Sequence, residues 1–202
     1  MLEYKCLDFR MKKLLIIGSS PLPMEDVTMR TAAGLRTWQF VDPLLKGHAK
    51  DFSLYLVTIA EPSAYTSKPK PLATHRSFQH QVFLKDETGL LAKLQKIHDR
   101  FQPDVILSVN TLPSFLAAQL KSSVPMWADL NGWIMAEAQA QAFKMQTDDY
   151  LPHYHFMQQT ILRRADKFSS VSQAQSLALT GELATLGRIS YKTFDYAFAE
   201  PI

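Results

Sequence analysis

Six runs of apolar residues, separated by helix-length amphipathic segments, constrain the fold more than any other feature of this sequence. The runs cover residues 13–18, 52–59, 81–84, 104–109, 125–130 and 167–171. They are continuously apolar rather than alternating, which is typical of strands that helices cover on both faces of a sheet. Strands that alternate with helices pair in parallel through right-handed crossovers. The sequence therefore predicts an α/β domain with a doubly wound, Rossmann-like parallel sheet.

Helices are predicted between these runs. Residues 88–101 carry a stripe of apolar side chains at helical spacing, and Pro103 prevents the helix from continuing. Two further helices are expected at residues 136–146 and 150–165, with a break between them. Pro43 lies inside the first predicted helix, where we expect a kink or a split.

The composition agrees with one globular unit. The chain has 202 residues, of which 47% are hydrophobic and 20% are charged, as is ordinary for a folded domain. Cys6 is the single cysteine and cannot form an internal disulfide, so we expect a reducing, cytoplasmic location. No apolar run approaches the roughly 20 residues that a membrane-spanning helix needs.

The net charge of +3 is mild, and we expect no nucleic-acid partner. Several basic side chains leave two interpretations open, because they could contact anionic phosphates and the surface of an anionic membrane, or simply be solvated. These residues are Lys68, Lys70, Arg163, Arg164 and Lys167.

The end of the first predicted strand is a candidate site, because ligands of an open α/β sheet bind beyond the carboxyl ends of its strands. Gly18, Ser19 and Ser20 follow this strand and could offer amides and hydroxyls to an anion, or form an ordinary turn. Arg30 and Arg36 could clamp a phosphate or carboxylate, or lie free on the surface. The glycine patterns of dinucleotide and P-loop sites are absent, which disfavours both.

The end of the fifth predicted strand is a second candidate. Asp129, Asn131 and Trp133 place a carboxylate, an amide and a large aromatic ring there, and Asn110 ends the neighbouring strand. Asp129 could orient a ligand hydroxyl or take its proton, or it could cap the next helix. The sequence has no H-E-x-x-H motif and no paired cysteines, so we expect no metal.

Residues 163–188 contain a helix end, a short apolar strand and a second helix. Ser172 caps this helix, Gln175 can reach back as in a capping box, and Gly187 supplies a left-handed end. This segment, together with residues 34–58, resembles the N-terminal domain of GT-B glycosyltransferases of the GT4 type (group 1).

The resemblance implies the acceptor-binding half of an enzyme that transfers a sugar from a nucleotide-sugar to a glycan, lipid or small-molecule acceptor. It implies no cofactor, Asp129 as the catalytic residue, and acceptor contacts from the other candidate residues. The donor site would lie in a C-terminal domain or a separate chain, so this chain alone would be inactive. We accordingly divide the sequence into a flexible leader (residues 1–10), the domain (11–190) and the start of an interdomain crossover (191–202).

Two other functions remain open, because a fold alone does not fix a function. One is a non-catalytic doubly wound module that binds a small ligand or a partner. The other is a sugar-nucleotide epimerase.

Overall fold

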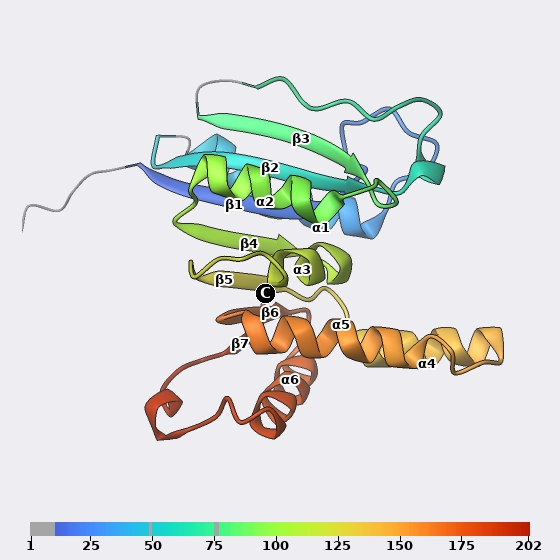
Figure 1. Ribbon diagram of the computed structural model, residues 1–202, viewed down its shortest axis with the longest axis vertical. Helices are drawn as coiled ribbons and strands as arrows, with labels where there is room; N and C mark the ends of the chain where they lie inside the picture. Colours follow the sequence, from blue (N-terminus) through green and yellow to red (C-terminus); the bar gives the residue numbers. More distant parts are fainter. Residues whose placement is uncertain (1–10, 49, 75–76) are drawn as a thin grey trace, which may run out of the picture.

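The computed structural model describes residues 11–48, 50–74 and 77–202, so the leader predicted at residues 1–10 lies outside it. The described residues form an α/β domain around one parallel sheet (Figure 1). Its strands are β1 (Lys12–Ser19), β2 (Phe52–Ala60), β3 (Phe78–Leu84), β4 (Val105–Val109), β5 (Met126–Asp129), β6 (Lys167–Ser170) and β7 (Ala199–Pro201). Their order across the sheet is β3-β2-β1-β4-β5-β6-β7, and every neighbouring pair is parallel.

Helices cover both faces of this sheet. They are α1 (Ala32–Gly47), α2 (Leu90–Phe101), α3 (Thr111–Ala118), α4 (Ile134–Met145), α5 (Leu151–Arg164) and α6 (Gln173–Thr185). In Figure 1, α1 lies behind the sheet, and α2, α3 and α5 lie in front of it. Single 3₁₀ turns at Pro62–Ala64 and Tyr191–Thr193 interrupt the connections. The predicted doubly wound α/β fold is confirmed.

The core divides into two layers because successive side chains of a strand point to opposite faces. On the α1 face, Ile16 and Leu56 belong to one apolar cluster with Val41 of α1. On the other face, Ile17 and Val57 belong to a second cluster that includes Leu94 of α2 and residues of α5 and α6. Burial on both faces explains why the strands are continuously apolar.

Some predicted elements differ from the structure. The helix predicted to kink or split at Pro43 is one continuous helix, α1, and Val41 and Leu44 hold it against the sheet on either side of the proline. The sequence predicted neither α3 nor β7. Residues 199–201 of the predicted crossover pair with β6 as the seventh strand of the sheet.

The caps predicted for α6 are present. The hydroxyl of Ser172 accepts a hydrogen bond from the Gln175 amide at 3.2 Å, and Gly187 has a φ of +69°. The Gln175 side chain reaches back as expected, although its oxygen accepts from the amide of Val171 at 3.1 Å rather than from Ser172. Its amide nitrogen donates to Leu130 O at 2.8 Å, which ties the start of α6 to the end of β5.

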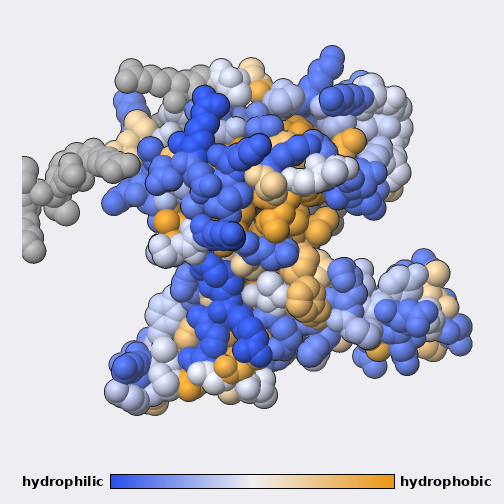
Figure 2. All heavy atoms as spheres, in the orientation of Figure 1, coloured by the Kyte–Doolittle hydropathy of each residue, from blue (hydrophilic) through white to orange (hydrophobic). Residues whose placement is uncertain are grey.

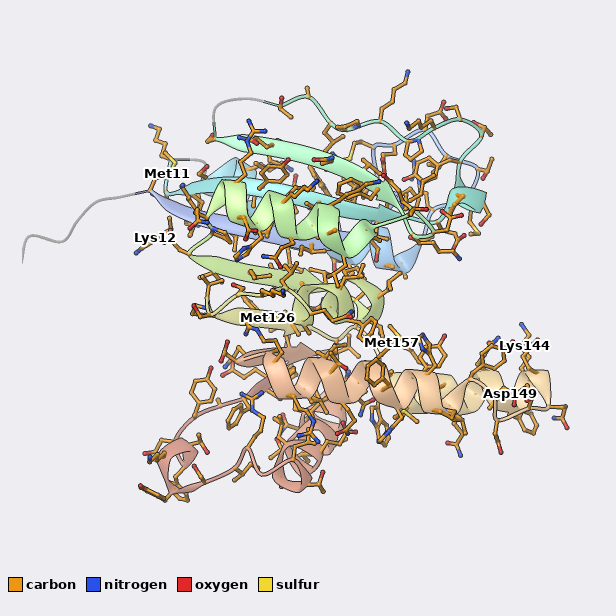
Figure 3. The ribbon with its side chains drawn as sticks, viewed as in Figure 1. Met11, Lys12, Met126, Lys144, Asp149 and Met157 are labelled. Carbon is orange, nitrogen blue, oxygen red and sulfur yellow. The ribbon has the colours of Figure 1, made fainter. Side chains whose placement is uncertain are left out.

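Helices α4 and α5 form a hairpin that projects beyond the sheet (Figure 1). Lys144 and Asp149 lie at its far end, whereas Met157 lies close to the sheet (Figure 3). Exposed Phe156 of α5 packs edge-to-face on Phe115 of α3 at 5.7 Å. Figure 2 shows hydrophobic residues on the surface where the hairpin meets the rest of the domain. None of the helices in the described part of the chain is long and apolar enough to cross a membrane.

Candidate functional site

Asp129 forms a buried ion pair at the carboxyl end of β5. Arg36 of α1 donates from Nε to Oδ2 at 3.0 Å and from Nη2 to Oδ1 at 2.8 Å. The Ser169 hydroxyl of β6 donates to Oδ1 at 2.6 Å, and the Asp129 side chain is 0% exposed. These contacts join one helix to two strands, and they direct both carboxylate oxygens toward protein donors.

Aromatic packing surrounds this ion pair. The Arg36 guanidinium lies 5.2 Å from the ring centre of Phe40, and Phe40 packs edge-to-face on Trp127 at 5.6 Å. The indole nitrogen of Trp127 donates to the Ser169 hydroxyl at 3.0 Å. The α1 face of β5 and β6 is therefore closed by a connected set of side chains.

Asn110 connects the ends of three strands at the point where the strand order reverses, between β1 and β4. Its side-chain nitrogen donates to Ala33 O at 3.0 Å and to the Ser19 hydroxyl at 3.4 Å, and its backbone amide donates to Asp129 O at 2.9 Å. Its φ of +76° is uncommon for a residue other than glycine. Ser19, Arg36, Asn110 and Asp129 thus form one contiguous group.

The start of α1, where a pyrophosphate lies in dinucleotide-binding folds, is in close contact with the first βα connection of this chain. A Cβ atom added to Gly34 would lie 1.7 Å from the carbonyl oxygen of Pro21. Ser20 and Leu22, on either side of Pro21, are 4% and 0% exposed. The first βα connection therefore packs directly on the first turn of α1.

The other predicted site residues make no described side-chain hydrogen bond to this group. Gly18 is buried beneath the Thr37 side chain, and Arg30 is exposed. Trp133 is 43% exposed and donates from its indole nitrogen to Glu182 at 2.9 Å. Asn131 is partly exposed beside it, and no described hydrogen bond joins either residue to Asp129. That these residues contact a ligand stays a prediction.

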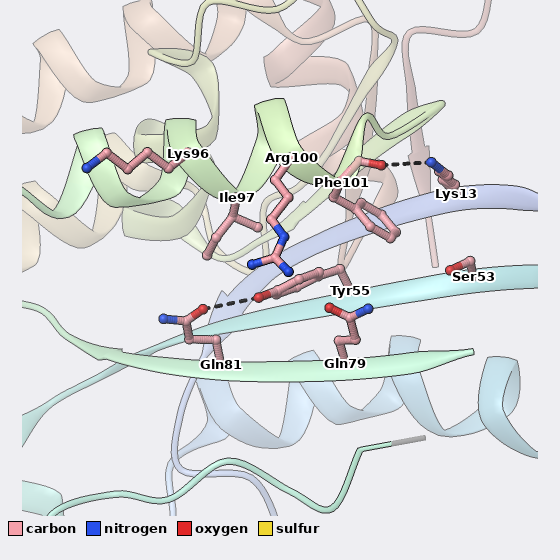
Figure 4. Close-up of a pocket in the computed structure, with 9 residues that line it drawn as sticks. All are labelled: Lys13, Ser53, Tyr55, Gln79, Gln81, Lys96, Ile97, Arg100 and Phe101. Carbon is pink, nitrogen blue, oxygen red and sulfur yellow. Dashed lines mark hydrogen bonds between the residues drawn. The ribbon is translucent and has the colours of Figure 1, made fainter. Parts of the chain in front are cut away.

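A separate pocket of about 420 Å³ lies between the second half of α2 and the first halves of β2 and β3 (Figure 4). We call it the α2 pocket. It is lined by Lys13, Ser53, Tyr55, Gln79, Gln81, Lys96, Ile97, Arg100 and Phe101. The polar floor residues come from the first halves of β2 and β3, so the pocket lies away from the carboxyl ends of the strands.

Three cations and no carboxylate line the α2 pocket. Arg100 reaches down from α2 so that its guanidinium lies above Tyr55, while Lys13 and Lys96 lie toward opposite ends (Figure 4). Lys13 Nζ is fixed by a 3.1 Å hydrogen bond to Phe101 O and lies 5.8 Å from the ring centre of Phe101. Neither Lys96 nor Arg100 forms an ion pair with any described residue.

The floor of the α2 pocket is polar but uncharged. The Tyr55 hydroxyl donates to Gln81 Oε1 at 3.1 Å, and the Tyr55 ring packs edge-to-face on Phe101 at 5.4 Å. Burial raises the pKa of Tyr55 and the charge of Arg100 opposes that rise, so the phenol stays neutral near pH 7. Gln79 and Ser53 make no side-chain hydrogen bond to the described residues, which leaves their polar groups open to a ligand.

The sequence contains a pattern of polar residues that indicates this pocket. These residues lie at the starts of strands, so they fall outside the carboxyl ends at which the candidate sites were predicted. On the α2 face, β2 presents Ser53 and Tyr55 before its apolar positions begin, and β3 presents Gln79 and Gln81. The register places Tyr55 beside Gln79, which brings the two polar pairs together. Paired polar residues at two-residue spacing, at the start of otherwise apolar strands, place polar side chains together on one face of the sheet.

Comparisons with known proteins correct the predicted family. No family model matches the chain, and no curated protein matches it. One similar solved structure is that of the DNA/pantothenate metabolism flavoprotein from Streptococcus pneumoniae, at 13% identity and a TM-score of 0.35, over 82% of this chain and 83% of that chain.

The prediction of a GT4-type glycosyltransferase was wrong: no family model and no curated protein supports it, and the similar structure named above is that of a flavoprotein. The predicted acceptor-binding function and its nucleotide-sugar donor are withdrawn with it. The same comparisons do not establish a non-catalytic module or an epimerase. The motifs that suggested the family are accounted for by helix caps and strand ends of the doubly wound fold.

Proposed function

We propose that this chain binds a small anionic molecule in the α2 pocket. The observation that carries the proposal is the lining itself, in which Lys13, Lys96 and Arg100 meet no carboxylate. The volume of about 420 Å³ falls within the range of small-molecule sites. A cleft lined by one sign of charge raises the local concentration of ligands of the opposite sign.

Arg100 is the residue best placed to bind the anion. Its guanidinium lies at the centre of the pocket, above Tyr55 (Figure 4), and it presents a planar set of donors that fits a phosphate or carboxylate. Its position in the last turn of α2 also suits the helix dipole. The ammonium group of Lys13 donates a hydrogen bond to Phe101 O, a free carbonyl at the end of α2. This contact offsets the negative partial charge that would otherwise repel an anion.

A second cavity, of about 290 Å³, lies between the loops that follow β1 and β2, and it is less suited to an anion. Lys68 and Lys70 line it, but so do Glu25 and Asp26. Burial raises the pKa of Glu25, whose carboxylate accepts hydrogen bonds from the Tyr65 hydroxyl and the Leu22 amide. The mixed charges of this cavity favour the α2 pocket as the anion site.

Calorimetric titration with ribose 5-phosphate at low ionic strength tests the proposal. We expect Arg100→Gln to weaken binding by about tenfold or more, because a hydrogen bond to a charged group contributes about 1.5–3 kcal/mol. Lys144→Gln is the matched control, since Lys144 lies at the tip of the α4–α5 hairpin (Figure 3). Raising the salt concentration should weaken binding to the wild-type chain.

Two results would contradict the proposal. One is the absence of binding to the wild-type chain at millimolar ligand. The other is an equal loss of affinity in the Arg100→Gln and Lys144→Gln variants, which would indicate a general effect of net charge rather than a site.

A further inference from the structure

The α2 pocket contains polar groups beyond those that a small anion would contact. The inference drawn from them rests on the function proposed above. Six of the nine residues that line it are uncharged, and the polar groups of Gln79 and Ser53 are open to a ligand. Both lie on the floor formed by β2 and β3, beside Tyr55 and below the side chains of α2 (Figure 4). A bare phosphate held by Arg100 would leave this part of the pocket unused.

The side chain of Gln79 indicates which chemical group could fill this part of the α2 pocket. A glutamine amide presents one acceptor and two donors side by side, so it pairs with a ligand edge that carries an adjacent donor and acceptor. Lactam edges of nucleobases present a donor and an acceptor side by side, as does the adenine edge with which Asn and Gln side chains pair. The Ser53 hydroxyl adds a donor or acceptor on the neighbouring strand.

The surroundings suit a planar group. The Arg100 guanidinium is flat and stacks favourably on aromatic rings, and it lies above the neutral Tyr55 phenol (Figure 4). Ile97 and Phe101 supply apolar contacts from α2. Neither end of this region carries a negative charge that would repel a phosphate.

We propose that the ligand class is a nucleoside monophosphate, with its phosphate at Arg100 and the lactam edge of its base at Gln79 and Ser53. The β2–β3 register and the position of α2 create this combination of one cation and two open polar groups. Gln79 and Ser53 then determine specificity, whereas Arg100 provides most of the affinity.

Three probes separate these contributions: uridine 5′-monophosphate, ribose 5-phosphate and uridine. We expect the nucleotide to bind the wild-type chain about five- to tenfold more tightly than ribose 5-phosphate, as a paired base edge contributes. Gln79→Ala should remove that gain and leave the affinity for ribose 5-phosphate unchanged. Gln139→Ala, an exposed substitution on α4, is the matched control and should change neither affinity.

The outcomes distinguish this inference from the function on which it rests. Equal affinities for the nucleotide and ribose 5-phosphate would overturn the inference and leave anion binding intact. The same conclusion follows if Gln79→Ala retains the full gain. Failure of both phosphates to bind would overturn the proposed function itself.

Discussion

Removing the charge of Asp129 should destabilise the domain strongly, because Asp129 anchors α1 to β5 and β6. Asp129→Asn keeps the shape of the side chain and leaves the Arg36 guanidinium without its carboxylate partner. Breaking a buried ion pair from one side costs about 3–5 kcal/mol. The Arg36 side chain retains 15% exposure and recovers some hydration, so we expect a loss of about 2–4 kcal/mol in the free energy of unfolding.

Equilibrium urea unfolding measures this loss, and the chain contains a suitable control. Lys46 and Asp42 form an exposed ion pair within α1 at 2.8 Å, with 76% of the lysine side chain exposed. Asp42→Asn should therefore cost no more than about 0.5 kcal/mol. A double-mutant cycle with Arg36→Met isolates the coupling between Arg36 and Asp129. Equal losses in the Asp129 and Asp42 variants would refute the anchoring role.

Acidification should destabilise the chain through His80, where burial lowers the pKa to about 4. Because the unfolded chain binds this proton near pH 6.5, stability should fall by roughly 3 kcal/mol between pH 6.5 and 4, and a His80→Gln variant should lose less in urea titrations at the two pH values. Gly34→Ala should destabilise the fold by about 2 kcal/mol or more, because the new methyl group would meet Pro21 O, whereas Gly181→Ala in the open interior of α6 should be neutral or stabilising by up to about 1 kcal/mol in thermal melts. An unchanged melting temperature for Gly34→Ala would contradict the close approach of the first loop to α1.

The sheet could be predicted from the sequence because its central strands are continuously apolar. Residues 13–18 and 52–59 fall within β1 and β2, and most of these residues are buried. β7 gave no comparable signal, since it has three residues, lies at the sheet edge and ends in Pro201. α3 spans eight residues and contains Pro113, so it showed no helical period.

The candidate site was harder to predict because its geometry depends on register. The sequence allowed the inference that four site residues lie together, because the carboxyl ends of parallel strands share one edge of the sheet. These residues are Ser19, Arg36, Asn110 and Asp129. The burial of Asp129 depends on packing between α1 and β6, which place Arg36 and Ser169 against it. No local sequence pattern reveals this packing. The family resemblance misled because capped helices that follow short strands occur throughout doubly wound folds.

The α2 pocket shows the same limitation. Ser53 and Tyr55 are separated by more than 20 residues from Gln79 and Gln81, and only the β2–β3 register brings them together. The cations come from a third element, α2, and from the start of β1. Strand-end reasoning excluded all of these residues, since none of them ends a strand.

Mapping of amide chemical shifts during a ribose 5-phosphate titration tests the proposed anion site most directly. For a ¹⁵N-labelled chain at low ionic strength, we expect saturable shifts concentrated at Ser53, Tyr55, Gln79, Gln81 and Arg100, the residues of the α2 pocket. The Arg100→Gln variant should lose them. Shifts confined to Ser19, Asn110 and their neighbours at the carboxyl ends of the strands, or no saturable shifts at all, would contradict an anion site in the α2 pocket.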